Sequence, residues 1–407
     1  MPITSRSALL SLLTEACELE HGLACSYLFS AFTLKQDLSE GGLTWQHLQM
    51  VRAWAAQVFF IAAQEMLHLA QVWNMQAAIG GTPYYMRPNF PQPPKYYPLN
   101  LPLRTERFSL AALDRFIQYE RPATIILRSE SPLSGSPQPA FKTVGELYAL
   151  IKSGFENIPE ETLFVGYPNR QVGADLVDFP ELVKVIDRAS ALEAIRRITH
   201  QGEGVDEDRD DCHFGLFKAI RKNYLIELAS SEGNGEPFAP VRLSISNPVA
   251  GASLQLGAHG ANPITDTRTS EVADCFDSIY GLMLRMLQYV FDNATGDAAL
   301  LRQFGKRAIE LMAAVIKPLG EALTLMPAGP DYEDQTAGPG FVLSRHVGLP
   351  NEPRAAAVVA LEKLQELSDR LRIASEGEPT PRQLRSASAN LDRLGASFRE
   401  YVQKRPS

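Results

Sequence analysis

The sequence predicts a mostly α-helical protein built around a bundle of long helices. Three features carry this prediction: a helix from about Ser7 that ends before the turn Ser39–Gly42, a strongly apolar helix over Thr44–Ile79, and apolar stripes at helical spacing after residue 270. Two long helices joined by a short loop form an antiparallel hairpin. We therefore expect the first two helices to pair along their length.

The second helix contains a glutamate and a histidine three residues apart, Glu65 and His68. This spacing places a carboxylate and an imidazole on one helix face, where both can bind the same metal ion. A solvated surface pair would have the same spacing. The flanking segments Val58–Ala63 and Leu69–Trp73 are apolar almost all round, however. We expect the pair to be buried and to need partners.

Glu20 is the expected partner from the first helix. Glu20 and Glu65 each lie roughly 20 residues, or about 30 Å, from the connecting loop, so they should lie at nearly the same level. Tyr27 is two turns after Glu20 on the same face, where it can orient a ligand or relay a proton, and it is the candidate catalytic residue. The alternative for Glu20 is an exposed charge beside Glu15 and Glu18.

A second pair of helices must supply further ligands, and Ala191–Ala219 is the strongest candidate region. Glu203 and His213 would come from adjacent helix ends and complete a set of three carboxylates and two imidazoles. That set suits a hard octahedral ion such as iron or manganese. The alternative is a helix-end charge and an ordinary capping histidine. Asp211 or Asp277 would be the next candidate, although Asp277 is expected at the surface.

Several further motifs occur in order along roughly the first 230 residues. They are Glu18–His21 leading to Tyr27–Leu28, Glu65–His68 with Asn74 and Gly80–Gly81, Phe116–Glu120, Thr143–Tyr148, Leu163–Gly166 with Gln171–Val172, and Gln201–Gly204 followed by His213–Phe214. With these motifs the chain resembles the ferritin-like family that includes the iminophenyl-pyruvate dimer synthase domain of violacein- and indolocarbazole-type biosynthesis. Cys212 departs from the pattern, since a small hydroxyl residue is expected before the histidine.

The resemblance implies a ferritin-like four-helix bundle with long insertions, a C-terminal helical extension and a non-haem metal centre. It implies two iron ions, with manganese as the alternative, and oxidation of an amino-acid-derived substrate by O2 or peroxide in secondary metabolism. The expected metal ligands are Glu20, Glu65, His68, Glu203 and His213. Three alternatives stay open: a manganese-catalase-like peroxide dismutase, an iron store, and a scaffold of this fold without catalysis.

Composition indicates a cytoplasmic globular protein. A net charge of −8 without a Lys/Arg cluster argues against nucleic acid as a partner. The segment Met1–Arg6 lacks the order of a signal peptide, and no apolar stretch has the length of a membrane span. The four cysteines show no paired spacing, so we expect them to be reduced and mostly buried. The expected partners are a small-molecule substrate, the oxidant and, in a small homo-oligomer, further copies.

The expected domains are a metal-binding bundle over residues 1–230, with an insertion at 83–185, and a helical region over 231–407 packed on the bundle. The Pro/Tyr-rich stretch Pro83–Leu103 cannot be helical and is expected to be an extended arm held over the bundle by its aromatic residues. The loop Met326–Leu349 is the candidate substrate lid.

Two further elements are expected in the C-terminal half. Alternating apolar residues in Pro240–Pro248 predict a short strand or an extended link. The helical stripe through Leu300, Ala308 and Met312 is expected to end at Pro318, because proline cannot continue a regular helix.

Overall fold

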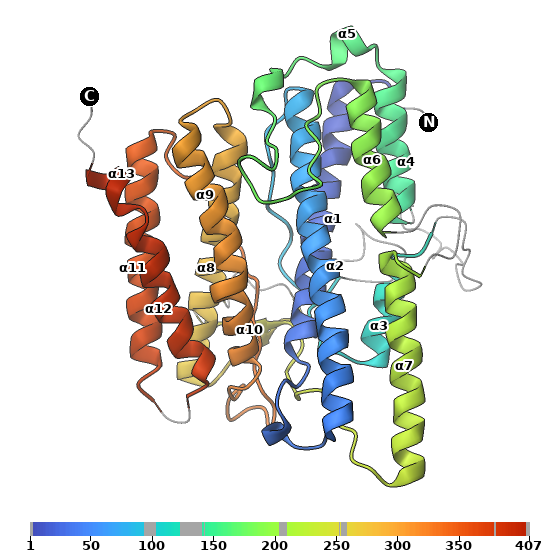
Figure 1. The fold of residues 1–407 in the computed structure, drawn as a ribbon, viewed down its shortest axis with the longest axis vertical. Coiled ribbons are helices and arrows are strands. Elements are labelled where there is room, and N and C mark those ends of the chain that lie inside the picture. Colours follow the sequence, from blue (N-terminus) through green and yellow to red (C-terminus); the bar gives the residue numbers. More distant parts are fainter. Residues whose placement is uncertain are drawn as a thin grey trace.

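The computed structural model describes residues 3–92, 103–122, 141, 143–202, 210–251, 253, 259–377 and 380–403. In this part of the chain the fold is mostly helical, and the helices form two groups that lie side by side (Figure 1). One group is built from the N-terminal half of the chain and the other from the C-terminal half. The predicted fold class is confirmed.

The first group is organised around the hairpin of α1 (Arg6–Phe32) and α2 (Trp45–Ala78), which pack against each other along their length. The side chain of Ser5 caps α1 by accepting a hydrogen bond from the Ala8 amide, and Thr44 caps α2 in the same way. A single 3-10 turn, η1 (Leu38–Glu40), lies in the connection. The predicted hairpin is therefore confirmed.

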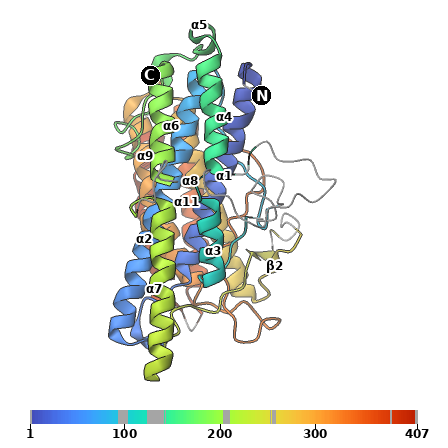
Figure 2. The same ribbon diagram turned by 90° about the vertical axis from the view of Figure 1, so that its right-hand side faces the viewer.

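The second pair of bundle helices is interrupted, because each member consists of two shorter helices. Helix α3 (Leu110–Tyr119) packs against α7 (His213–Asn234), and α4 (Val144–Asn157) packs against α6 (Arg188–Gly202) and α1. Figure 2 shows α4 above α3 and α6 above α7. Both breaks therefore fall near the middle of the bundle.

This arrangement corrects the expectation that residues 83–185 are an insertion, because α3 and α4 are bundle elements. Their apolar stripes, including Phe116 of α3 and Leu147 of α4, are buried in the core. Two short elements, α5 (Glu160–Leu163) and the 3-10 turn η3 (Pro168–Arg170), follow α4. The division of the chain into domains at residue 230 stays a prediction.

The C-terminal group packs around α8, which contacts α9, α10 and α11, while α10 also contacts α1. Its elements are α8 (Thr267–Asp292), α9 (Ala298–Leu311), the π-helical turn η5 (Met312–Ile316), α10 (Lys317–Leu323), α11 (Pro353–Ala374), α12 (Arg382–Ala396) and α13 (Arg399–Gln403). Two residue pairs form a small parallel sheet between β1 (Pro248–Val249) and β2 (Asn262–Pro263). Helix α1 is buried on nearly every side because it packs against α2 and α4 of its own group and against α10 of the C-terminal group.

The helix that contains Pro318 does not end there, as the sequence had suggested, but continues to Leu323. The π-helical turn Met312–Ile316 comes directly before the proline, which then occupies the first turn of α10. A proline is tolerated in the first turn of a helix, where its missing N–H would have no partner. The change from α-helical to π-helical hydrogen bonding before Pro318 therefore lets the helix continue past the proline.

The segment Met326–Leu349 is not a lid over the predicted site. It packs against the C-terminal helices, and the Phe341 ring is fully buried, edge-on to Phe276 and Tyr280 at 5.0 and 5.1 Å between ring centroids. Its backbone is held as well, since the Ala337 amide donates to the Met326 carbonyl at 2.9 Å. Residues 337–343 of the loop are buried throughout, which fixes this part of the segment in place.

The arm Pro83–Leu103 behaves as expected in its described part, residues 83–92 and 103. Tyr85 and Phe90 are buried, and the Trp73 indole of α2 donates a hydrogen bond to the Tyr84 carbonyl at 2.8 Å. Within the predicted link Pro240–Pro248, Val241 pairs with Leu34 and Ser244 pairs with Thr336, each in an isolated bridge.

All four cysteines are free and buried, as predicted. Among the described residues, no helix combines the length and the apolar character that crossing a bilayer requires.

Candidate dinuclear metal site

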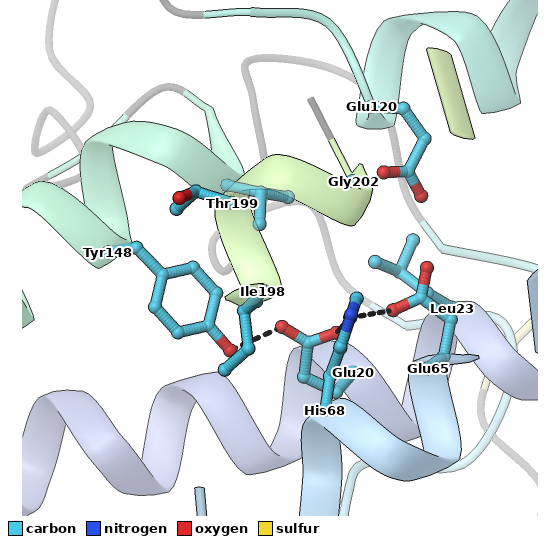
Figure 3. A pocket seen from close by; sticks show the side chains of 10 residues that line it. Glu20, Leu23, Glu65, His68, Glu120, Tyr148, Ile198, Thr199 and Gly202 are labelled. Atoms are coloured by element: carbon cyan, nitrogen blue, oxygen red, sulfur yellow. Dashed lines mark hydrogen bonds and ion pairs between the residues drawn. The ribbon is translucent and has the colours of Figure 1, made fainter. Parts of the chain in front are cut away.

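Five carboxylate and imidazole side chains, of types that can bind metal ions, converge in the middle of the bundle, where the interrupted helices meet the hairpin. They form two groups that share Glu65: one with Glu20 and His68, and the other with Glu120 and His213. All five are at most 2% exposed. Figure 3 shows Glu20, Glu65, His68 and Glu120 around one small pocket.

Glu65 lies between the two histidines and presents one carboxylate oxygen to each. Its Oε2 is 3.1 Å from His68 Nδ1, and its Oε1 is 3.0 Å from His213 Nδ1. Each histidine also faces one further carboxylate: Glu20 lies 3.4 Å from His68 Nδ1, and Glu120 lies 3.5 Å from His213 Nδ1. The two halves therefore repeat one pattern of a histidine, its own carboxylate and the shared Glu65.

The structure brings together four of the five predicted ligands, Glu20, Glu65, His68 and His213. Glu203 lies outside the described residues. Helix α6 reaches Gly202, which lines the pocket, and α7 begins at His213. The predicted meeting of two helix ends at this point is confirmed.

Glu120 is the site residue that sequence reasoning missed. It follows the last turn of α3, and it belongs to a motif noted in the sequence without being given a role. The available signal was a carboxylate directly after a strongly amphipathic segment that contains Phe116 and Tyr119. Such a residue is also compatible with an ordinary helix end, so its approach to His213 could be seen only in the folded chain.

Asp277, a fallback candidate, is neither at this site nor at the surface. It is buried in α8, where it accepts a hydrogen bond from the Val342 amide at 3.1 Å. Burial raises its pKa well above the usual value for an aspartate. The expected surface role is therefore wrong. Asp277 instead fixes the loop that precedes α11.

A glutamine side chain orients each histidine through a hydrogen bond at Nε2, the ring nitrogen that faces away from the carboxylates. His68 Nε2 lies 2.9 Å from Gln201 Oε1, and His213 Nε2 lies 3.0 Å from Gln64 Oε1. The Gln201 amide is itself fixed, because its NH2 group donates to Glu181 at 2.7 Å. An amide oxygen accepts the Nε2 proton, which leaves each Nδ1 available to bind a metal ion.

Two tyrosines hold the outer carboxylates. Tyr27 of α1 donates a hydrogen bond to Glu120, and Tyr148 of α4 donates to Glu20. Burial raises the pKa of both phenols well above the usual value, and the adjoining carboxylates raise it further. Both phenols therefore stay protonated and act as donors. The orienting role predicted for Tyr27 agrees with this contact, although the carboxylate that it holds is Glu120.

Three buried carboxylates in one cluster are compensated by protons when no metal is bound. Burial, followed by the charge of Glu65, raises the pKa of Glu20 to about 7. Burial alone would lower the pKa of His213, but the Glu65 and Glu120 carboxylates outweigh it and raise the pKa to about 9. The pKa of His68 is likewise raised well above its usual value, against the effect of burial, by Glu20 and Glu65. Cations could replace these protons.

The residues fit a pair of metal ions. Glu65 Oε1 and His213 Nδ1 are buried, yet neither has a hydrogen-bond partner of good geometry among the described residues. The two atoms instead face each other at 3.0 Å as an ion pair, and a cation that bound both would satisfy them in the metal-bound protein. The adjoining cavity of about 10 Å3 has room for little more than a water molecule or an ion. The oxygen and imidazole donors suit iron or manganese.

Removing the hydroxyl of Tyr148 is expected to destabilise the metal-free protein. In Tyr148→Phe, a carboxylate oxygen of Glu20 loses its buried donor, which should lower the free energy of unfolding by about 1–3 kcal/mol. Urea denaturation measures this change, with Tyr224→Phe on α7 as the matched control. Because Tyr148 is not a ligand, the variant should still bind metal. Equal losses in both variants would show that the hydroxyl has no special role.

Two curated proteins are similar to this chain. The chain is 27% identical over 362 residues to 2-imino-3-(indol-3-yl)propanoate dimerase of Chromobacterium violaceum, an alignment that covers 83% of this chain and 34% of that protein. It is 26% identical over 379 residues to dichlorochromopyrrolate synthase of Lentzea aerocolonigenes, covering 84% and 36%. The chain thus spans about one third of the length of these relatives.

A solved ferritin-like protein from Caulobacter vibrioides superposes with a TM-score of 0.47 and 17% identity, covering 79% of this chain and 98% of that one. The ferritin-like family model matches residues 13–222. That match covers more than half of the chain and includes all five converging side chains. The chain belongs to the ferritin-like family.

Proposed function

We propose that this chain is an oxidoreductase with a dinuclear non-haem iron centre, which oxidises a small aromatic amino-acid-derived compound with O2 or peroxide. The observation that carries the proposal is the position of Glu65 between two matching histidine–carboxylate pairs. A shared carboxylate of this kind can bridge two metal ions held in one bundle.

Each residue of the site has a definite role in this proposal. Glu65 would bridge the ions, His68 and Glu20 would bind one, and His213 and Glu120 would bind the other. Bound iron would supply the redox chemistry that these side chains lack. Tyr27 and Tyr148 keep the outer carboxylates in place, and either phenol can hold a proton beside them. The surrounding burial keeps bulk water away from the ligands.

The reaction class is supported by the two relatives, whose names describe a dimerase of an indolyl imino acid and a synthase of a chlorinated pyrrole acid. The first name gives an imino acid that carries an indole ring, which supports an aromatic amino-acid-derived substrate for this chain, and both relatives are biosynthetic enzymes. Manganese is the second candidate metal, because the same donors suit it. A manganese enzyme that dismutates peroxide is therefore the alternative function.

The test of the proposal is oxidation measured together with metal analysis of the purified protein. We expect about two iron ions per chain, and consumption of O2 or peroxide that depends on an added indolyl imino acid. Rapid O2 release from peroxide by a manganese-loaded protein would favour the alternative function. Iron-loaded protein that leaves the imino acid unchanged with either oxidant would overturn the proposal.

Size and iron capacity should separate an enzyme from an iron store. We expect a monomer or small oligomer that binds about two metal ions per chain, because the described residues of the site form two ligand groups. Size-exclusion chromatography with iron loading measures both quantities. A shell of many subunits that accumulates iron far beyond two ions per chain would contradict the enzyme assignment.

His68→Ala is expected to lower the metal content sharply, because it removes the imidazole of one half-site. The matched control is His47→Ala, which removes another buried histidine of α2 that contacts Glu227 and not the carboxylate cluster. Elemental analysis of both variants after purification tests the expectation. Wild-type metal content in His68→Ala would show that the ligand assignment is wrong.

A further inference from the structure

A second and much larger cavity lies between α2 and the C-terminal helices. Its volume is about 460 Å3, within the range of small-molecule sites, which is about 300–1,000 Å3. Residues of α2, of the loop around Phe179 and of the π-helical turn line it. None of the five clustered side chains described above is among the lining residues. Figure 1 shows α2 beside α9 and α10, and Ile309 of α9 and Lys317 of α10 are among the lining residues.

The walls are suited to a flat apolar ring. Phe59, Phe60 and Leu67 come from α2, and Met312 faces them from the C-terminal group. Phe60 is 55% exposed, although a large aromatic ring is usually buried. Methionine adapts its shape to aromatic partners. π-Helical turns, such as the one that begins at Met312, occur frequently at functional sites.

The polar groups of the cavity favour a cationic nitrogen on the ligand. Asp178 and Glu181 line the cavity, and Lys317 is the cation among its lining residues. Lys317 is already paired with Glu321 at 2.7 Å, and it lies over the Phe59 ring. The two carboxylates are therefore the charges left to attract a ligand group of opposite sign.

Two hydrogen-bond chains connect the cavity with the histidines of the metal site. Gln64 lines the cavity and bonds His213 Nε2 directly. Glu181 also lines it and fixes Gln201, which bonds His68 Nε2. A ligand in this cavity would thus contact Gln64, which bonds His213. It would also contact Glu181, which holds the Gln201 side chain that bonds His68.

We propose that this cavity binds a planar aromatic amine or imine, with the ring against Phe60 and Met312 and the nitrogen toward Asp178 and Glu181. The binding itself requires no metal. That the ligand is the substrate of the oxidation rests on the proposed function.

The test is calorimetric titration of the metal-free, full-length chain with tryptamine and with indole-3-acetate. Tryptamine should bind, and indole-3-acetate should bind about tenfold more weakly, or not at all, because its charge is opposite. Ala313→Trp fills the cavity from the π-helical turn and should abolish binding. The control, Ala299→Trp, places the same ring at an exposed position of α9 outside the cavity and should leave binding unchanged.

Phe60→Ala keeps the test valid if Ala313→Trp fails to fold, because Phe60 is exposed and its loss should not disturb the core. We expect it to weaken tryptamine binding about tenfold. Unchanged binding in Phe60→Ala and Ala313→Trp, or no binding to the wild type, would overturn the inference even for an active oxidase. A dimer that dissociates in Phe60→Ala, without tryptamine binding, would also overturn it by assigning the cavity to a second copy. Binding to a protein that proves inactive would leave the inference standing and reject only the proposed function.

Discussion

Replacing Glu65 with alanine is expected to remove both metal ions from the protein. Glu65 is the one residue common to the two ligand groups found among the described residues, and its oxygens lie 3.1 and 3.0 Å from the two imidazoles. Without it, each ion would keep only one carboxylate and one histidine from these groups. A hard cation with so few protein ligands exchanges readily with solvent.

The comparison with Glu20→Gln makes this prediction specific. Glu20 belongs to one of the two groups, so the loss of its carboxylate should weaken the binding of one ion and leave the other ion in place. We expect metal contents of about zero for Glu65→Ala and about one for Glu20→Gln, against about two for the wild type. Elemental analysis and circular dichroism would be measured together, to exclude unfolding.

Glu321→Ala is the matched control, since it removes a largely buried carboxylate that pairs with Lys317 in the C-terminal group. It should retain both ions. If Glu65→Ala and Glu20→Gln lose metal to the same extent, Glu65 does not bridge two sites.

Metal binding is expected to depend steeply on pH, with affinity rising as pH rises. In the metal-free protein, His213 has a pKa of about 9, and the pKa of His68 is raised well above its usual value, so both imidazoles carry an extra proton at neutral pH. Each must lose the Nδ1 proton before it can bind an ion. Between about pH 7 and 9, the affinity of the ion that His213 would bind should therefore rise about tenfold per pH unit. The affinity of the ion at His68 should change in the same direction.

Calorimetry in buffers of different ionisation enthalpy counts the protons released. At pH 8, His213 should release about one proton on metal binding and His68 should add to the release, whereas Glu20, with a pKa of about 7, is mostly ionised already. His213→Ala should release about one proton fewer. Affinity that does not change over this pH range would contradict protonated histidines in the metal-free site.

The stability of the metal-free protein should change with pH in the opposite direction. A histidine whose pKa is raised from 6.5 to about 9 stabilises the fold fully below pH 6.5, and this contribution is lost as the pH rises through about 9. The raised pKa of Glu20 acts in the same direction between its usual value of 4.5 and about 7. Thermal unfolding with a chelator present should therefore show lower stability at pH 9 than at pH 6.

The sequence alone determined the first hairpin and half of the site. The apolar flanks of Glu65 and His68 required a buried helix, and the three-residue spacing placed both side chains on one face. Counting residues from the loop then placed Glu20 at the same level, where it approaches His68. These properties follow from helix geometry, which acts over a few residues and can be read directly from a pattern.

The sequence also marked His213 as a ligand, but only the tertiary structure decided which carboxylate accompanies it. Glu120 follows α3, and it meets His213 because α3 packs against α7. The spacing of residues within either helix does not predict this contact. The orienting role of the glutamines was also not predicted: Gln64 looks like an ordinary polar residue of a helix, and Gln201 was noted in a motif without a role. Such contacts depend on which helix faces pack together, and that is set by burial summed over the whole chain.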